Sequence, residues 1–173
     1  MARIAGDYRA GGIYAACNSE KGAGGSIAAT RTAARREGST YRLTGEKILA
    51  SSGRYAATFF STAKVRPEDL SGAGIVELFF VDVQSPGVQV LDDWDGFGMR
   101  STESHTVRYA DAPVRELAGF PNFIKLVQPL EYWFCLFAAI PLGCARAMLK
   151  ATGTPAPRVT SARITLSLIL VVM

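Results

Sequence analysis

The sequence has 173 residues, enough for one domain or for one domain with an appended segment. Hydrophobic residues make up 49% of it and charged residues 20%, which is enough apolar material for a packed core and excludes a disordered chain. The net charge of +4 is small and the arginines are scattered, whereas nucleic-acid-binding proteins concentrate basic residues on one face, so we expect no nucleic-acid partner.

The cysteines and the apolar segments indicate the compartment. Cys17, Cys135 and Cys144 are odd in number, widely spaced and set among apolar neighbours, which predicts buried free thiols in a reducing compartment. Residues 1–12 lack the apolar run of a signal peptide. Residues 164–173 are apolar but only about half as long as a membrane helix requires. We therefore expect a cytoplasmic protein without a membrane span.

The amino-terminal part reads as short strands separated by turns. Residues 11–18 are a candidate strand, and residues 19–26 are predicted to be a loop because three glycines in four positions permit positive φ. Residues 27–36 are expected to include a strand that ends at the turn of residues 37–39. In residues 40–53 two extended runs flank Gly45, which predicts a β-hairpin with its turn at that glycine.

The strand pattern continues through the middle of the sequence. The strongest strand is residues 75–83, a continuous run rich in β-forming residues. The remaining predictions are a buried strand in 55–65, a surface loop in 66–74, a turn at 85–87, and short strands at 88–91 and 106–109. Short strands at this spacing predict a mainly β fold, an antiparallel barrel or sandwich.

The pattern changes after about residue 117. Residues 123–151 place apolar side chains at helical spacing over most of the helix surface. Pro129 and Pro141 each remove a hydrogen-bond donor, so we expect a kinked helix or two helices. A single small barrel cannot cover so much apolar surface, which predicts self-association as a homo-oligomer, or a partner helical chain, through residues 123–149. No role is assigned to residues 153–173.

Three segments in order resemble the middle β-domain of the acyl-CoA dehydrogenase family. Residues 19–26, Ser-Glu-Lys-Gly-Ala-Gly-Gly-Ser, are similar to its T-E-P-x-A-G-S-D loop. Residues 41–53 are similar to its Y-x-L-N-G-x-K-x-W-I-T-N-G segment, and residues 98–104 to its G-x-R-x-S-x-S segment. The resemblance implies a β-barrel flavin-contacting domain in residues 1–117 and, in residues 118–152, the start of a C-terminal helical bundle.

The resemblance also implies a cofactor, FAD, and residues that contact it. Ser19 matches a position that hydrogen-bonds the edge of the isoalloxazine ring, and Ser51 matches one that does so at the N5 side. Gly24 and Gly25 lie in a glycine-rich stretch whose backbone N–H groups suit a phosphate. Together with Ser52, these are the candidate cofactor-binding residues. Hydrogen-bond donors near N5 stabilise the charge of a reduced flavin, so the residue types suit the role.

Departures from the family pattern leave the substrate open. Leu49 stands where the family usually has a tryptophan that packs near the flavin, and Gly25 replaces a serine. Ser52-Gly53 and Trp94-Asp95 are more typical of flavin monooxygenases built on the same scaffold. The family's N-terminal helical domain and most of its bundle, which carries the catalytic glutamate, have no counterpart here. A fragment, a truncated reading frame and half of a split protein all remain open, and the catalytic residue is unknown.

Other polar residues have plainer interpretations. His105 is the single histidine and has no identifiable catalytic partner nearby in the sequence, so we interpret it as structural. Asp92, Asp93 and Asp95 lack the glycine and distal glutamate of a calcium loop and are predicted to form a solvated acidic turn. No metal site is expected.

The sequence therefore predicts an FAD-dependent oxidoreductase of the acyl-CoA dehydrogenase type, which removes hydrogen from the α and β carbons of an acyl-CoA or acts on another small molecule. Two alternatives stay open: a flavin-dependent monooxygenase on the same scaffold, and a non-catalytic β-barrel remnant or interaction module. Because no catalytic base is identified, we expect little or no dehydrogenase activity from the isolated chain.

Overall fold

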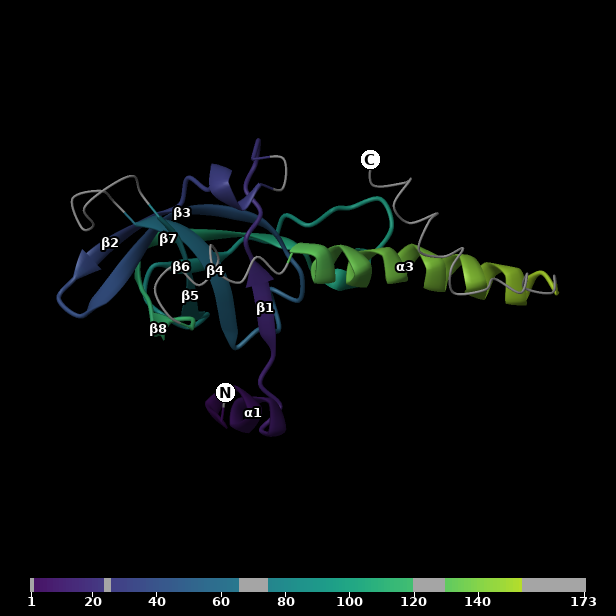
Figure 1. The fold of residues 1–173 in the computed structure, drawn as a ribbon, viewed down its shortest axis with the longest axis horizontal. Helices are drawn as coiled ribbons and strands as arrows, with labels where there is room; N and C mark the ends of the chain where they lie inside the picture. Colours follow the sequence, from purple (N-terminus) through teal and green to yellow (C-terminus); the bar gives the residue numbers. More distant parts are fainter. Residues whose placement is uncertain (1, 24–25, 66–74, 120–129, 154–173) are drawn as a thin grey trace. The chain divides into compact units, whose positions relative to one another are not determined.

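The computed structural model describes residues 2–23, 26–65, 75–119 and 130–153. The chain divides into two compact units, residues 1–127 and 128–173, and each is described by itself. Figure 1 shows the sheet of the first unit and the long helix of the second. The first unit begins with helix α1 (Ala2–Arg9). The predicted surface loop at residues 66–74 lies outside the described residues.

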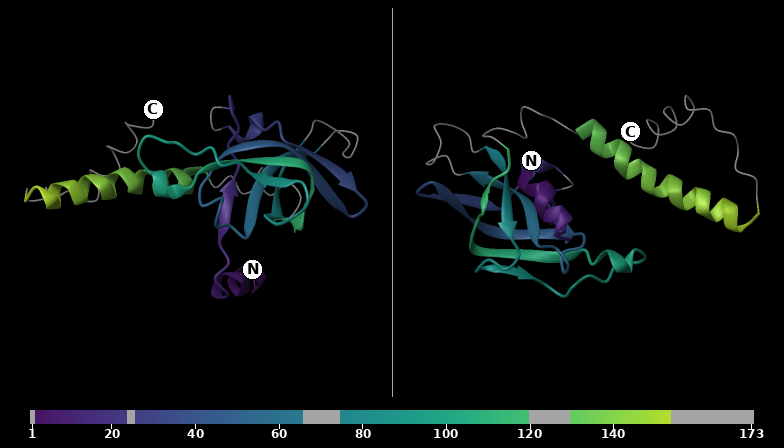
Figure 2. Two further views of the ribbon diagram at one scale, coloured as in Figure 1. Left: turned by 180° about the vertical axis from the view of Figure 1, so that it is seen from behind. Right: turned by 90° about the horizontal axis from the view of Figure 1, so that it is seen from below.

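The described strands of the first unit form one eight-stranded sheet. They are β1 (Tyr14–Cys17), β2 (Ala33–Glu37), β3 (Thr40–Ala50), β4 (Thr58–Val65), β5 (Val76–Asp82), β6 (Val88–Val90), β7 (His105–Pro113) and β8 (Glu116–Leu117). Their order is β6-β7-β3-β2-β4-β5-β8, with β1 paired to β4. The sheet curls into a half-barrel (Figure 2), which confirms the predicted mainly β fold followed by a helix.

Two strand pairs in the half-barrel are parallel, a feature that the sequence did not predict. β1 and β2 both run parallel to β4, and the other pairs are antiparallel. The parallel pairs arise because β3 and then β4 each reverse direction, which returns β4 beside β2. One edge of β4 is therefore shared between β2 and β1.

The predicted hairpin within residues 40–53 is wrong, because β3 is one strand of eleven residues that passes through Gly45. Gly45 has a φ of +153°, and a Cβ there would lie 2.7 Å from the Thr32 Cα. The glycine therefore allows a close approach of two backbones rather than a turn. The hairpin that exists joins β2 to β3, where Glu37 pairs with Thr40 across Gly38.

The other strands follow the sequence pattern with changed ends. β4 and β5 lie within the predicted ranges, and β6 follows the predicted turn. β7 is longer than predicted because His105 and the residues up to Pro113 pair with β3. β8 and α1 were not predicted. A strand as short as the two residues of β8 is recognisable only from its pairing with β5.

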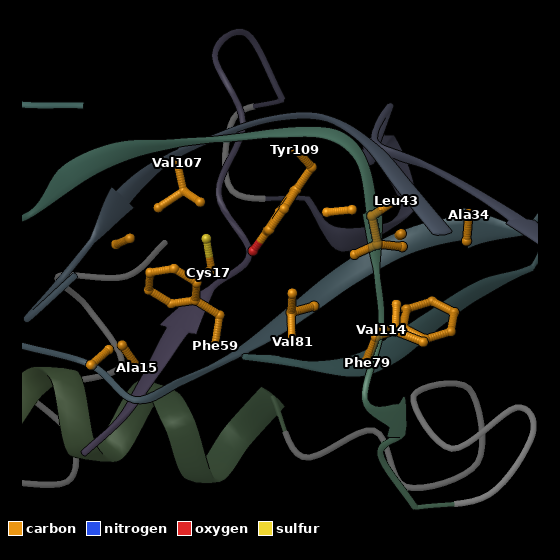
Figure 3. Packing of buried hydrophobic residues seen from close by; sticks show 14 of the residues in the cluster. Ala15, Cys17, Ala34, Leu43, Phe59, Phe79, Val81, Val107, Tyr109 and Val114 are labelled. Carbon is orange, nitrogen blue, oxygen red and sulfur yellow. The ribbon is translucent and has the colours of Figure 1, made fainter. Parts of the chain in front are cut away.

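The core lies on the concave side of the sheet, where aromatic and valine side chains pack together with several alanines, Leu43 and Cys17 (Figure 3). Tyr109 is almost fully buried, and its hydroxyl points toward the Cys17 sulfur. Burial raises the pKa of the Cys17 thiol to about 11, so this cysteine stays protonated at neutral pH. The buried free thiol predicted for Cys17 is confirmed.

The second unit contains helix α3 (Leu130–Ala151), which continues through Pro141. The alternative of a helix break at Pro141 is therefore wrong, while Pro129 lies outside the described residues. Cys144 is exposed, contrary to the prediction of a buried thiol, because the sequence neighbours of a helical residue lie on other faces of the helix. The side chain of Cys135 is not among those described.

Within the described part of the chain, no helix combines the length and the apolar character that crossing a membrane would require.

Candidate functional site

The candidate site lies at the end of β3, where the backbone departs from regular strand geometry. Leu49 and Ser52 have φ values of +59° and +63°, and the pairing register with β7 shifts between Lys47 and Ala50. The Ser51 amide donates a hydrogen bond of 2.9 Å to the Leu49 carbonyl. This bulge turns Ser51 and half of the Leu49 side chain to the surface. An apolar side chain and a hydroxyl-bearing residue are therefore both exposed at this end of β3.

The loop between β6 and β7 lies against this bulge. It contains a short turn of 3-10 helix, η3 (Arg100–Thr102), with Met99 and Glu103 on either side in left-handed conformations. The Ser52 amide donates to the Thr102 carbonyl at 2.7 Å, and the Gly53 amide donates to the Glu103 carbonyl at 3.2 Å. Two of the three segments that resemble the family are therefore hydrogen-bonded to each other.

Three hydroxyl groups connect the loop to the bulge. The Ser51 Oγ lies 2.9 Å from the Ser104 Oγ, which lies 2.8 Å from the Thr102 Oγ1. The Thr102 hydroxyl donates to the Met99 carbonyl at 2.8 Å. Ser104 is buried, Thr102 half-buried and Ser51 exposed, so the hydroxyl chain runs from the loop to the surface at Ser51.

Ser19, the other predicted ring contact, lies beside the same strand. Its carbonyl accepts a hydrogen bond of 2.9 Å from the Ile48 amide, and the residue is half-buried. The structure therefore brings Ser19, Ser51 and Ser52 to the same end of β3. Gly24 and Gly25 lie outside the described residues, so the predicted phosphate contact stays a prediction.

Behind the site lies a buried ion pair that sequence reasoning missed. The Lys47 Nζ lies 2.6 Å from the Glu20 Oε1, and neither side chain is more than 3% exposed. Glu20 also accepts hydrogen bonds from the Thr32 amide, the Thr32 hydroxyl and the Arg31 amide. Lys47 donates a further bond of 3.1 Å to the Thr62 hydroxyl. Because Glu20 follows Ser19 and Lys47 precedes Ile48, the pair fixes the two backbone segments that carry the candidate site.

The electrostatics of the pair follow from these contacts. Burial opposes the charge of Glu20, but the hydrogen bonds from Lys47, Thr32 and Arg31 outweigh it and lower the pKa of Glu20 to about 2. Burial also lowers the pKa of Lys47, against the attraction of Glu20. One sequence signal was available: Lys47 lies four residues after the buried Leu43, which places both side chains on the same face of a strand.

His105 is buried, and both of its ring nitrogens are hydrogen-bonded within the protein. Its Nδ1 accepts hydrogen bonds of 3.1 Å from the Asp93 and Trp94 amides, so this nitrogen carries no proton and the Nε2–H donates to Glu103 at 2.8 Å. The hydrogen bond from His105 is the largest contribution to the lowered pKa of Glu103. The imidazole thus joins the acidic turn to the loop that ends at Ser104.

The acidic turn holds no cation site. Asp93 accepts a hydrogen bond from the Thr106 amide at 2.9 Å, and Asp92 and Asp95 contact Arg54 and Arg100. No group of metal-ligating side chains occurs among the described residues. Each carboxylate therefore has its own partner: Thr106 lies in β7, Arg54 follows β3, and Arg100 lies in the loop itself.

The fold agrees with a sequence comparison. The model of the acyl-CoA dehydrogenase middle domain matches residues 15–112, more than half of the chain. The chain therefore belongs to the acyl-CoA dehydrogenase family. The matched residues contain the whole bulge, the loop between β6 and β7 and the buried ion pair.

Individual relatives show the same relationship. The Probable acyl-CoA dehydrogenase YngJ of Bacillus subtilis is 28% identical over 137 residues, which are 77% of this chain and 36% of the relative. A crystal structure of a probable acyl-CoA dehydrogenase from Mycobacterium abscessus superposes with a TM-score of 0.74 and 28% identity, covering 92% of this chain and 43% of that one. This chain therefore spans less than half the length of either protein.

Other relatives differ in activity and in flavin. FMN-bound TdsC from Paenibacillus sp. A11-2 has a TM-score of 0.62 and 26% identity, covering 69% of this chain and 30% of that one. The matching proteins also include a dibenzothiophene monooxygenase and a structure that holds FAD. The family is thus flavin-dependent, and its members include both dehydrogenases and monooxygenases.

Proposed function

We propose that this chain is the flavin-contacting β-domain of an FAD-dependent oxidoreductase of the acyl-CoA dehydrogenase type. The observation that carries the proposal is the end of β3, where Ser51 and Leu49 are both exposed and the Ser51 hydroxyl is hydrogen-bonded to Ser104. A flavin ring has apolar faces and a polar edge, so this pair of groups fits it. The bulge and the hydroxyl chain hold both groups in place.

Each predicted cofactor residue has a role in this proposal. Ser51 hydrogen-bonds the ring at its N5 side, and Leu49 covers the apolar ring beside it. Ser19 and Ser52 add polar groups at the ring edge, while Gly24 and Gly25 offer backbone N–H groups to the phosphates. The bound flavin supplies a two-electron acceptor for an acyl-CoA thioester. We assign no catalytic base to this chain, and the base is expected on the helical domains that longer relatives contain.

A monooxygenase is the second candidate. Ser52-Gly53 and Trp94-Asp95 favour it, as do the relatives that bind FMN or are monooxygenases. The third candidate, a non-catalytic module, gains support from the absence of an assigned base. For either enzyme, α3 is proposed to pack against a second copy or a helical partner chain, because Leu142 and Met148 are 47% and 69% exposed.

The first test is the visible absorption spectrum of the full chain after incubation with FAD or FMN and removal of excess flavin. The proposal expects a retained flavin band, stronger with FAD. A stronger band with FMN would favour the monooxygenase candidate. A colourless protein with both flavins would overturn the proposed function and leave the non-catalytic candidate. Sedimentation as a single monomer would contradict the proposed oligomer.

A further inference from the structure

The hydroxyl chain from Met99 to Ser51 has a fixed direction. Two oxygen atoms about 2.8 Å apart attract each other only with a hydrogen between them. The three contacts of the chain therefore require three hydrogens, and the three hydroxyls supply one each. The Met99 carbonyl supplies none, so Thr102 must donate to it.

The remaining directions follow one by one. Because the Thr102 hydrogen is used on Met99, the contact between Ser104 and Thr102 requires Ser104 to donate. The Ser104 hydrogen is then used as well, so the contact between Ser51 and Ser104 requires Ser51 to donate. The hydrogen of Ser51 therefore points into the protein, and its outward side offers only lone pairs.

We propose that Thr102 and Ser104 are positioning residues that turn the Ser51 hydroxyl into a hydrogen-bond acceptor toward its ligand, so that the site prefers reduced over oxidised flavin. This inference rests on the proposed function. Two-electron reduction adds hydrogen at N5, which changes that atom from an acceptor into an N–H donor. An acceptor at Ser51 pairs with the donor of the reduced ring and faces the lone pair of the oxidised ring.

Thr102 offers a matched pair of variants. Thr102→Val keeps the shape of the side chain and removes its hydroxyl, while Thr102→Ser keeps the hydroxyl. In the valine variant Ser104 no longer has an acceptor in the loop, so it donates to Ser51 and the Ser51 hydrogen points outward. The Met99 carbonyl still accepts from the Thr102 amide and the Trp94 indole, and Thr102 is only half-buried, so both variants should fold.

The experiment measures the dissociation constants of oxidised and dithionite-reduced FAD for the full chain without oxygen. Thr102→Val is expected to lower the preference for reduced FAD about tenfold, the equivalent of one hydrogen bond. The midpoint potential of the bound flavin should fall by about 30 mV for that tenfold change. The preference of Thr102→Ser for reduced FAD should stay within about twofold of that of the unchanged protein. In a Ser51→Ala background, Thr102→Val should no longer change the preference.

The possible failures are distinguishable. If both redox forms bind and the valine and serine variants show the same preference, the inference is overturned and the proposed function stands. The inference is also overturned if Thr102→Val lowers the preference for reduced FAD by the same factor in the Ser51→Ala background, since Thr102 would then not act through Ser51. If neither redox form binds, the proposed function and this inference are both overturned.

Discussion

Two ion pairs on the same strand show how burial changes the consequence of a similar contact. On the inner face of β3, Lys47 lies 2.6 Å from Glu20, and their side chains are 0% and 3% exposed. Near the start of β3, Arg42 lies 2.7 Å from Asp111, with side chains that are 27% and 53% exposed. The two distances are nearly equal, so the difference between the pairs lies in their contact with water.

The inner pair is buried away from water, so water cannot replace a lost partner. Removing one member of a buried pair leaves an uncompensated charge, whereas water and salt screen an exposed pair. Each carboxylate also has a second cation: the Arg35 guanidinium lies 3.0 Å from Asp111, and the mostly exposed Arg31 guanidinium lies 3.7 Å from Glu20. Breaking the inner pair is therefore expected to cost more stability than breaking the outer pair.

The largest expected effect is that of Lys47→Met. This change leaves the buried Glu20 carboxylate without its closest cation and with only the mostly exposed Arg31 at 3.7 Å, which should lower the free energy of unfolding by about 3–5 kcal/mol. Urea unfolding followed by circular dichroism measures the loss, and a variant already unfolded without urea would also agree with it. A loss under about 1 kcal/mol would show that water reaches the pair and that the comparison of the two pairs is wrong.

A double variant separates lost charge from lost packing. Lys47→Met combined with Glu20→Gln removes both charges, so it should be more stable than Lys47→Met alone. If the double variant is less stable by the sum of the two single losses, the two residues do not act as a pair.

A smaller loss of stability is expected when the pH is lowered. The pKa of Glu20 is about 2 in the folded chain, below its ordinary value of 4.5, so the unfolded chain binds a proton first as the pH falls. The stability that Glu20 contributes is thus fully present above about pH 4.5 and is lost as the pH falls toward about 2. Urea unfolding across this window should show the decline.

Other carboxylates titrate in the same window, so a variant is needed as a reference. The pKa values of Asp93, Glu103 and Asp111 are also lowered by their partners. Glu20→Gln removes the Glu20 contribution and keeps the other three, and its stability should therefore fall less steeply with acid. Equal slopes in the two proteins would assign the acid sensitivity to the surface carboxylates.

The smallest effect is expected from Arg42→Gln at the outer pair. The hydrogen bonds from Arg35 and then Arg42 lower the pKa of Asp111, so the variant should move that pKa part of the way back toward its ordinary value. NMR titration of the Asp111 carboxyl measures this shift. The unfolding midpoint should change far less than in Lys47→Met, and the difference should vanish at about 1 M salt, where the Debye length is about 3 Å. A change that persists at high salt would contradict a screened surface pair.

Local patterns predicted the parts of the fold that depend on neighbouring residues. The continuous run of β-forming residues at 75–83 predicted β5, and the helical spacing after residue 123 predicted α3. Gly45 was misread because a glycine between two extended runs is typical of a turn. The residue that requires a glycine there is Thr32, thirteen positions away and brought close by the sheet.

The sequence by itself determined the family, through three motifs in the correct order, and with it the candidate residues Ser19, Ser51 and Ser52. Only the tertiary structure decided how those residues are held. Lys47 meets Glu20 across 27 residues, and Ser51 meets Ser104 across 53. Such contacts follow from strand order and register, which place distant residues side by side. A motif records the residue types, whereas the direction of the hydroxyl chain depends on distances that exist only in the folded chain.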